Sequence, residues 1–211
     1  MKLVRPKVEL LEDPKTHYPY LVEKISDAGW TSTRFDASDV PFGERERFVE
    51  FLIKKGHESV LEHGSISVSI LADRGFLAEI TRHRVGIAFT VESTRYCNYS
   101  RARFGGELEM IDPKSYYDRL DDLQYQSLLS SFEQAETVYN FLTKEGIPPE
   151  TARSVLPLGL ACRIYATANI REWRYVIKLR SEKSNHPLMR KIMKEVLKEF
   201  KRNYPVFFKD L

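Results

Sequence analysis

Most of the side chains in this sequence that could do chemistry gather in one stretch, Arg82–Tyr96. An arginine-histidine-arginine triplet occupies residues 82–84, an apolar run follows at 85–89, and Ser93 and Arg95 come next. Each arginine presents a planar fork of donors that fits two phosphate oxygens at once. A solvated helix end is the commoner explanation for a single arginine, but the cluster favours a phosphate-bearing ligand. We expect the chain to leave a helix here, cross the floor of a pocket and return with more cationic groups.

Three further arginines follow in the second half of the chain, Arg153, Arg171 and Arg180. Arg153 and Arg180 have apolar neighbours, and such an arginine often only lays its stem along apolar surface. One position of this kind means little. The three together raise the odds of an anion-binding role.

A metal site is a second way to interpret the polar residues. His57, His63 and His83, with Glu58 and Glu62, could supply nitrogen and carboxylate ligands. The sequence has no His-Glu-x-x-His pattern, and the spacing of the first two histidines does not suit ligands on one helix. The arginines beside His83 would oppose a bound dication. We therefore predict no metal site, and we set aside a metal-dependent phosphohydrolase.

Nucleophilic catalysis has two cysteines and one serine as candidates. Cys97 and Cys162 are too few for a disulfide framework or a metal-binding set. Arg95 could lower the thiol pKa of Cys97, but a small buried cysteine is the commoner case. Ser93 lacks the surroundings of a nucleophile elbow. We expect neither cysteine to attack a substrate and expect Ser93 to form hydrogen bonds.

Length and composition place the chain among single-domain globular proteins. Its 211 residues are 42% hydrophobic and 30% charged, which excludes a disordered or membrane-spanning chain. A net charge of +3 with interspersed signs gives no basic patch, so we expect no nucleic-acid partner. The first six residues lack a signal-peptide pattern. We expect one domain, residues 1–211, in the cytoplasm and away from membranes.

The elements that must position these residues alternate between strands and helices in the first half. Alternation predicts strands at Val8–Leu11 and Ser65–Leu71. Helical spacing predicts helices over Tyr20–Ala28 and from Phe42 to the glycine at 56. A helix over Arg74–Arg84 would then carry the arginine-histidine-arginine triplet at its C-terminal end.

The second half continues the alternation. The longest helix is predicted over Ser115–Glu145, with an apolar stripe that includes Leu123, Leu128 and Phe132. The other predicted elements are strands at Glu107–Ile111 and Ala161–Ile170, a short helix that begins at Pro148 and stops at Pro157, and helices over Arg171–Ser181 and His186–Phe200.

Five segments, in order and spread between about Phe42 and His186, resemble the signature of the flavin-dependent thymidylate synthases (the ThyX family). The family signature is an Arg-His-Arg triplet, seven or eight residues, and a serine; eight residues intervene here. The segments are Gly56-His57-Glu58-Ser59 through Glu62-His63, Arg82-His83-Arg84 with Ser93-Thr94-Arg95-Tyr96, Arg153–Pro157, Asn169-Ile170-Arg171, and Leu179-Arg180.

The resemblance implies a fold, an assembly and a reaction. The fold is α/β (α+β), with a central mixed sheet flanked by helices, in a homotetramer whose active sites lie between subunits and hold FAD. The reaction methylates dUMP to dTMP, with the carbon from methylenetetrahydrofolate and the reducing equivalents from NADPH through the flavin. No cysteine nucleophile is needed.

Matching positions imply the site residues. The expected FAD contacts are His57, Ser59, Glu62, Arg82, His83, Arg84, Asn169 and Arg171. The expected dUMP contacts are Glu79, Glu92, Ser93, Thr94, Arg95, Arg153 and Arg180. Arg180 and Ser93 are the residues expected to take part in catalysis. Arg180 would stabilise negative charge on the uracil ring, and Ser93 would hold the nucleotide.

Two segments depart from the family pattern. Glu92 directly precedes Ser93, whereas the shorter motif has a glutamate two residues before the serine. Arg34 stands where a small flavin-contacting residue is common, and His186 could lie near the flavin. A non-catalytic nucleotide-binding module that uses the same arginines remains the alternative to the enzyme.

Overall fold

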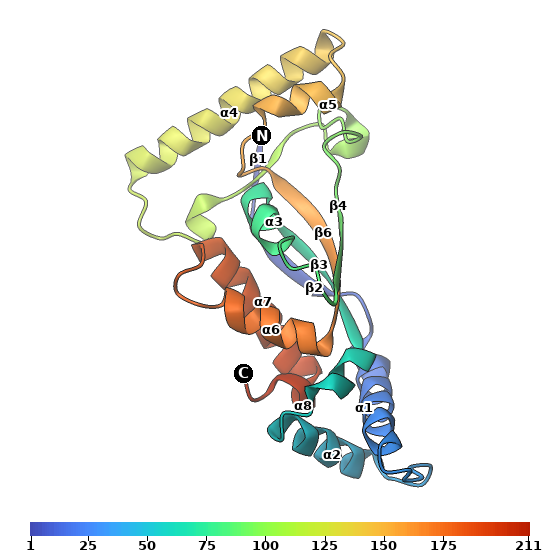
Figure 1. Cartoon of the computed structure of the whole chain (residues 1–211). Coiled ribbons are helices and arrows are strands. Elements are labelled where there is room, and N and C mark those ends of the chain that lie inside the picture. Colours follow the sequence, from blue (N-terminus) through green and yellow to red (C-terminus); the bar gives the residue numbers. More distant parts are fainter. The chain divides into compact units, whose positions relative to one another are not determined.

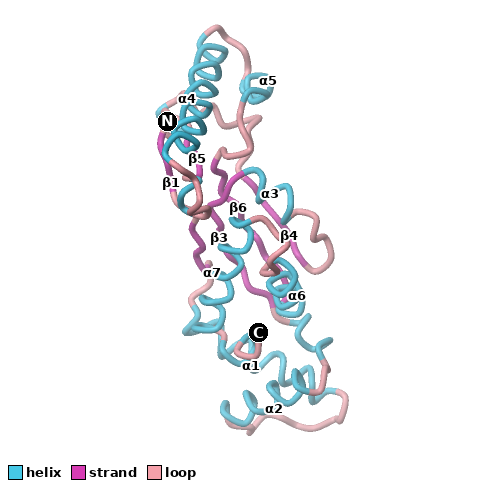
Figure 2. Tube along the Cα trace, turned by 90° about the vertical axis from the view of Figure 1, so that its left-hand side faces the viewer, coloured by secondary structure: helices cyan, strands magenta, loops and turns pink.

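Six strands form two sheets in the computed structural model, which describes all 211 residues. The four-stranded sheet has the order β2-β3-β6-β4, and β1 pairs with β5 in parallel with Lys2 opposite Glu109 (Figure 2). The strands are β1 Lys2–Val4, β2 Lys7–Leu10, β3 Ser65–Asp73, β4 Ile87–Val91, β5 Glu109–Ile111 and β6 Ala161–Asn169. The mixed α/β class is confirmed, with the strands divided between two sheets.

Alternating side chains explain the two longest strands. In β3, Ile66, Val68 and Ile70 are fully buried, as the alternation of isoleucine and valine with serine predicts. In β6, Ile164 and Ala166 are buried in the same alternating way.

The chain divides into two compact units. The first unit comprises Met1–Lys7, Ile70–Arg82 and Thr90–Ile164. The second unit comprises Val8–Ser69, His83–Phe89 and Tyr165–Leu211. The strands β2, β3, β4 and β6 have residues in both.

Helices make up most of the second unit (Figure 1). They are α1 Pro14–Thr31, α2 Phe42–Lys54, the 3-10 segment η1 Glu58–His63, α6 Ile170–Arg180, α7 Pro187–Asn203 and α8 Pro205–Phe208. Side-chain caps define where they begin. Asp13 accepts a hydrogen bond from the Lys15 amide at 3.1 Å at the start of α1. Asn169 accepts one from the Glu172 amide at 2.8 Å at the start of α6.

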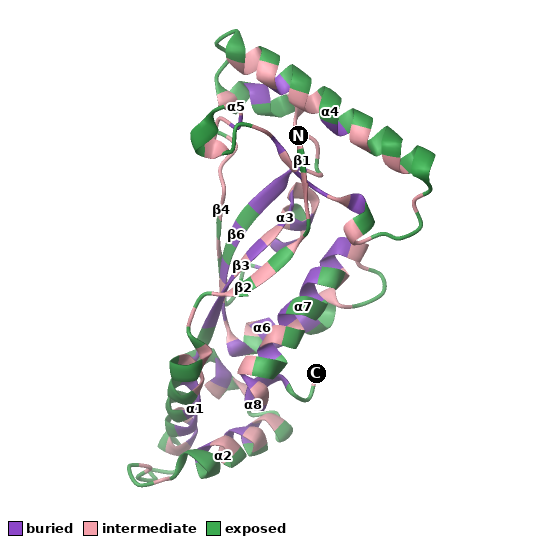
Figure 3. Cartoon of the chain, turned by 180° about the vertical axis from the view of Figure 1, so that it is seen from behind, coloured by how far each residue is buried: buried purple, intermediate pink, exposed green.

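The core of the second unit centres on Trp173 of α6, which is fully buried and donates its indole N–H to the carbonyl of Ile66 at 2.8 Å. Phe200 of α7 packs edge-on against it, with ring centres 5.4 Å apart. Figure 3 shows the buried face of α7 in purple and its solvent face in green. This packing fixes α6, which carries several of the predicted site residues.

The first unit has its own core, where Tyr139 and Phe132 of α4 pack with Leu108, Met110 and Leu160. Its helical elements are α3 Arg74–Ile80, η2 Ala102–Phe104, η3 Pro113–Ser115, α4 Asp122–Lys144, α5 Pro149–Ala152 and η4 Arg153–Val155. A capping box of Asp121 and Gln124 begins α4.

The prediction for residues 74–91 was wrong in two places. The helix α3 ends at Ile80, so the arginine-histidine-arginine triplet follows the helix. Residues Ile87–Val91 form β4, an edge strand that was not predicted, while Val85 and Gly86 before it line a cavity. A continuous apolar run lacks the alternation that identifies a strand, which is why the pattern did not indicate β4.

The predicted stripe of α4 was only partly correct. The helix begins at Asp122, later than expected, and Phe132 and Tyr139 alone are buried. Leu123 is 79% exposed and Leu128 is 38% exposed. The apolar stripe of α4 is therefore longer than the part of the helix that the core of the first unit covers.

Several other helix and strand predictions were confirmed, with shifted ends. Helix α1 begins at Pro14 and not at Tyr20, and β5 begins at Glu109. Strand β1 and helix α8 were not predicted. No helix combines the length and the apolar character needed to cross a membrane.

Candidate functional site

Two neighbouring cavities in the second unit collect most of the residues expected to contact a flavin. Each has a volume of about 590 Å³, and both are lined by Glu58 and Arg171. His57 and Ser59 line one of them, and Glu62 and Asn169 line the other. The structure thus brings five of the eight predicted cofactor residues together: His57, Ser59, Glu62, Asn169 and Arg171.

Arg171 is an exposed cation that lines both cavities. It lies in the first turn of α6, and its Nη1 donates to Oε1 of Glu62 at 2.5 Å. Both side chains are half exposed, and Glu58 adds a longer contact at 4.0 Å. An exposed ion pair of this kind is weak, so an anionic ligand can replace the carboxylate.

Gly86 sets the backbone that borders the second cavity. Its φ is +72°, and a Cβ atom placed there would lie 2.6 Å from Nδ2 of Asn169. The Asn169 amide N–H donates to the Gly86 carbonyl at 3.0 Å. The position therefore requires glycine both for its conformation and for this close approach.

His83 is buried, at 8% exposure, and does not project into solvent. Nε of Arg180 donates to its Nε2 at 2.9 Å, and its Nδ1 lies 3.4 Å from Oε1 of Glu172. Burial, with the nearby Arg180 charge second, lowers the pKa of His83 below its ordinary range. Burial raises the pKa of Glu172. The central residue of the triplet is thus held by two side chains of α6.

The remaining predicted residues of this stretch are not among those that line the two cavities. Arg82 and Arg84 are exposed; Arg82 belongs to the first unit and Arg84 to the second. Glu79 is half-buried in α3, in the first unit.

Four of the residues expected to contact the nucleotide meet in the first unit. Nη1 of Arg153 donates to the Thr94 hydroxyl at 3.2 Å. Ser93 Oγ accepts from the Arg95 amide at 3.2 Å, which folds the loop into a tight turn. The Arg95 guanidinium donates to Oε2 of Glu150 at 3.2 Å through Nη2, with both side chains half exposed. Hydroxyl and guanidinium groups, which are donors suited to an anion, therefore lie together here.

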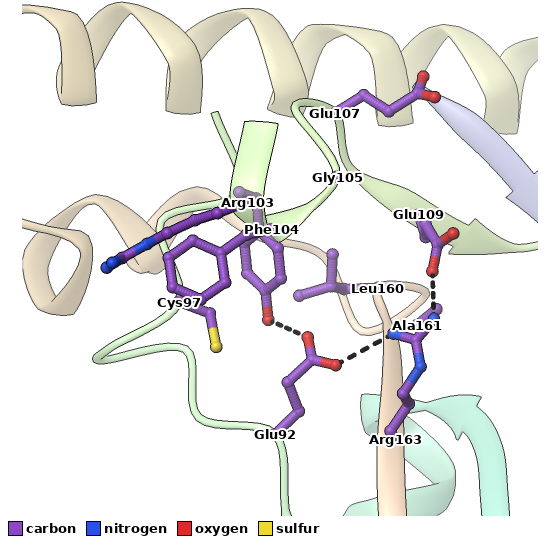
Figure 4. Close-up of a pocket in the computed structure, with 11 residues that line it drawn as sticks. Glu92, Cys97, Arg103, Phe104, Gly105, Glu107, Glu109, Leu160, Ala161 and Arg163 are labelled. Atoms are coloured by element: carbon purple, nitrogen blue, oxygen red, sulfur yellow. Dashed lines mark hydrogen bonds and ion pairs between the residues drawn. The ribbon is translucent and has the colours of Figure 1, made fainter. Parts of the chain in front are cut away.

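Glu92 anchors the start of that loop (Figure 4). Its carboxylate accepts from the Tyr99 hydroxyl at 2.9 Å and from Nη1 of Arg163 at 3.3 Å. Its carbonyl accepts from Nη2 of Arg74 at 2.8 Å. Arg163 also donates to Glu109 at 3.3 Å, and these residues border a cavity of about 420 Å³. The carboxylate of Glu92 is thus engaged by two protein groups.

The two cysteines are free thiols. Burial raises the pKa of Cys162 to about 12, and burial together with Glu92 raises the pKa of Cys97. A raised pKa keeps a thiol protonated and poorly nucleophilic.

The second-unit cavities fit the chemistry of a flavin dinucleotide. Arg171 in the first turn of α6 offers a cation of the kind that binds phosphate oxygens. Asn169, His57 and Ser59 offer hydrogen-bonding groups suited to a ring edge or a ribose. The cradle beside Gly86 has no room for a side chain.

Sequence reasoning missed Glu172 and Glu150. Glu172 follows the N-cap Asn169 by three residues, the spacing of a capping pair, and that pattern could have drawn attention to it. Glu150 lies in the first turn of α5, where an acidic residue is ordinary, so nothing in the sequence indicated its contact with Arg95.

These elements define a mixed α/β protein with a group of arginine and polar side chains in each unit. Residues 17–206 of the chain match the model of the Thy1 family, which is described as "Thymidylate synthase complementing protein". That match covers most of the chain. The chain therefore belongs to the Thy1 family.

Curated relatives agree with this family. A probable flavin-dependent thymidylate synthase of Mycobacterium phage L5 is 32% identical over 218 residues, which covers 97% of this chain and 88% of that protein. The flavin-dependent thymidylate synthase of Synechocystis sp. is 27% identical, over 75% of this chain and 76% of its own. That of Streptomyces coelicolor is 25% identical, over 84% and 79%.

Proposed function

We propose that this protein is an FAD-dependent thymidylate synthase, a methyltransferase that converts dUMP to dTMP. Methylenetetrahydrofolate supplies the carbon, and NADPH supplies the reducing equivalents. The observation that carries the proposal is the family match over residues 17–206, joined to a second-unit cavity pair that fits a flavin dinucleotide. The names of the relatives, flavin-dependent thymidylate synthases, support the same activity.

The flavin would be held in the second unit. FAD, when bound, passes on the reducing equivalents that NADPH delivers. Arg171 at the start of α6 would bind its phosphate oxygens in place of Glu62. Asn169, His57 and Ser59 would orient its neutral groups by hydrogen bonds. Of the triplet, Arg82 and Arg84 are exposed and accessible to a ligand.

The dUMP phosphate would bind in the first unit. Arg95 and Arg153 carry guanidinium groups, and Ser93 and Thr94 carry hydroxyls on the same loop. The phosphate would replace Glu150 on Arg95, because an exposed ion pair between two flexible side chains holds weakly. Glu79 and Glu92 stay candidates for contact with the nucleotide.

Arg180 would act on the reacting ring, with Ser93 holding the nucleotide. A guanidinium beside the uracil stabilises negative charge that develops when C5 loses its proton, because a fixed cation needs no reorganisation. Its place at the end of α6, against the buried His83, supports a fixed orientation.

The protein would work as one functional domain, residues 1–211, in a cytoplasmic homotetramer with active sites between subunits. Support for an oligomer comes from α4, on which large apolar side chains are exposed to solvent. Leu123 is 79% exposed and Phe141 60% exposed, and a subunit contact would cover them.

Two measurements test the activity. The purified protein should bind FAD with the visible absorption of a flavin. With FAD, NADPH and methylenetetrahydrofolate, it should release the C5 hydrogen of dUMP. If the protein binds dUMP but releases no hydrogen under these conditions, it is a non-catalytic nucleotide-binding module. If it takes up no flavin, the enzyme proposal is wrong.

Subunit mixing tests the assembly. The variants R171A and R153A should each be inactive, one on the flavin side and one on the nucleotide side. If a site draws the two arginines from different subunits, random mixed tetramers should recover about a quarter of the activity. If each site takes both from one subunit, mixing recovers none, because every subunit carries one defect.

A further inference from the structure

Three side chains of the second unit form a chain of contacts from Glu172 through His83 to Arg180. We propose that His83 and Glu172 are positioning residues for Arg180: a neutral imidazole, with its proton on Nδ1 facing Glu172, fixes the plane of the guanidinium that acts on the nucleotide. This inference rests on the proposed function, and it replaces the expected flavin contact of His83 with a role toward the substrate.

The geometry places His83 between two groups of the same helix. Nε of Arg180 lies 2.9 Å from Nε2 of His83, a good hydrogen-bond distance. Oε1 of Glu172 lies 3.4 Å from Nδ1 on the opposite side of the ring, with side-chain exposures of 6% for His83 and 17% for Glu172. Both ring nitrogens therefore face protein partners.

The donor groups of Arg180 determine which nitrogen of His83 carries the proton. An arginine guanidinium has N–H donors and no acceptor, and it stays protonated in proteins. Nε2 of His83 must therefore offer a lone pair to Arg180. In a neutral imidazole the proton then sits on Nδ1, where Glu172 Oε1 is the facing acceptor. A carboxyl oxygen accepts whether or not the group is ionised.

Burial and charge keep the imidazole neutral. Burial and the Arg180 charge lower the pKa of His83. The groups around the ring are Arg180, Glu172 and the Tyr175 ring, edge-on at 5.9 Å, all from α6, and the chain neighbours Arg82 and Arg84. Arg82 and Arg84 are exposed, so Arg180 is the cation that opposes a positive charge on the ring.

Two anchors fix the guanidinium plane. His83 receives Nε, and Oδ1 of Asn185 receives Nη1 at 3.3 Å. Because the guanidinium is planar, holding these two atoms determines where its other N–H groups point. An imidazole acceptor does this without neutralising the charge, whereas a carboxylate there would compensate it. The arrangement suits a cation that must stabilise charge on a substrate.

The first experiment compares acceptors at position 83. His83→Gln keeps an oxygen that can accept from Arg180, whereas His83→Phe leaves Nε without that partner. For the C5 hydrogen release from dUMP, we expect kcat to fall about 100-fold in His83→Phe, since a displacement of about 1 Å can cost that much. We expect His83→Gln to keep kcat within about fivefold of the wild type, and KM for dUMP to change less than kcat in both.

A matched control separates positioning from general packing. His17 is another half-buried histidine of the second unit, and its Nδ1 lies 3.1 Å from the Tyr204 hydroxyl. His17→Phe should lower the thermal midpoint but leave kcat unchanged. The proposal is overturned if His17→Phe and His83→Phe lose the same activity, or if His83→Gln is no better than His83→Phe. It is also overturned if FAD affinity, from flavin fluorescence, falls in parallel with kcat.

The second arm changes Glu172. Glu172→Gln retains an oxygen that can accept the Nδ1 proton, so kcat should stay within about fivefold. Glu172→Leu removes the acceptor and favours the other tautomer, whose Nε2–H would face the Arg180 donor. We expect kcat to fall about tenfold or more in Glu172→Leu only. Equal losses in both variants would refute the assignment of the tautomer.

The third arm needs no turnover. The five histidines can be followed by NMR with ¹³C at Cε1, and His83→Gln identifies the signal of His83. Its pKa should lie below 6.5 and should rise in Arg180→Gln, because a nearby cation is removed. An unchanged pKa of His83 in Arg180→Gln would refute the coupling between the two side chains. If the wild type releases no C5 hydrogen, the proposed function fails, while this titration still decides whether the two side chains are coupled.

Discussion

Substituting Gly86 by alanine probes the backbone between the arginine-histidine-arginine triplet and β4. With φ at +72°, an alanine in this left-handed conformation costs about 1–2 kcal/mol. The new methyl would lie 2.6 Å from Nδ2 of Asn169 and force that side chain to move. Asn169 caps α6 through the Glu172 amide, and losing such a cap costs about 0.5–2 kcal/mol. The sum is about 1.5–4 kcal/mol of unfolding free energy.

Two other glycines provide controls for each contribution. Gly146 has φ +87° with open space around it, so Gly146→Ala should cost only the backbone term, about 1–2 kcal/mol. Gly43 lies in α2 with nothing within 4 Å and an ordinary helical backbone, so Gly43→Ala should be neutral or stabilising. These three variants separate conformation from contact.

Urea unfolding followed by circular dichroism measures the three changes in one assay. Flavin titration then reports the site, because Asn169 lines the cavity and Gly86→Ala should weaken FAD binding as well as stability. The reasoning is refuted if Gly86→Ala costs no more than Gly146→Ala. It is also refuted if the three variants bind FAD equally well.

Three further predictions concern arginine contacts. Asp210→Asn weakens the pairing with buried Arg174, at 2.6 and 2.7 Å, and should cost about 1–3 kcal/mol of stability at pH 7. Arg174 holds the pKa of Asp210 below its ordinary 3.8, so this contribution is present above pH 3.8 and is lost as pH falls through the lowered pKa. Glu150→Gln frees Arg95, and should lower KM for dUMP about two- to fivefold while changing stability by less than about 0.5 kcal/mol. Arg171→Ala should weaken FAD binding about 10- to 100-fold, measured by flavin fluorescence.

Each of these has a contrary outcome. A stability difference between wild type and Asp210→Asn that persists unchanged at pH 2 would show that the carboxylate charge is not its source. A higher KM for dUMP in Glu150→Gln would mean that the carboxylate helps to bind the nucleotide. Unchanged FAD affinity in Arg171→Ala would remove Arg171 from the flavin site.

Periodic segments and capping residues were predictable because their physics is local. Strand β3 alternates from Ile66 to Ile70, and α6 begins at Asn169, an N-cap residue whose side chain needs no distant partner. The short strands were not predictable. Lys2 of β1 pairs with Glu109, 107 residues away, and three residues carry no alternation of their own.

Burial of individual side chains was harder to predict. The stripe of α4 contains Phe132, which is buried, and Leu123, which is 79% exposed, at helical spacing. Spacing identifies a face of the helix but not how far the covering core extends. His83 was expected to face a ligand because of its charged neighbours, yet it is buried against α6, which follows it by more than 80 residues.

The partner of each arginine distinguishes the roles that sequence alone could not separate. Arg174 is buried and donates to both carboxylate oxygens of Asp210, so its charge is compensated and its role is to hold the C-terminus on α6. Arg95 and Arg171 face exposed carboxylates, which an anionic ligand can displace. Arg180 donates to an imidazole, an acceptor without a negative charge that holds the orientation of the guanidinium. A sequence contains these arginines as equivalent letters, whereas the structure shows the kind of acceptor that each one meets: a carboxylate held through both oxygens, an exposed carboxylate or an imidazole.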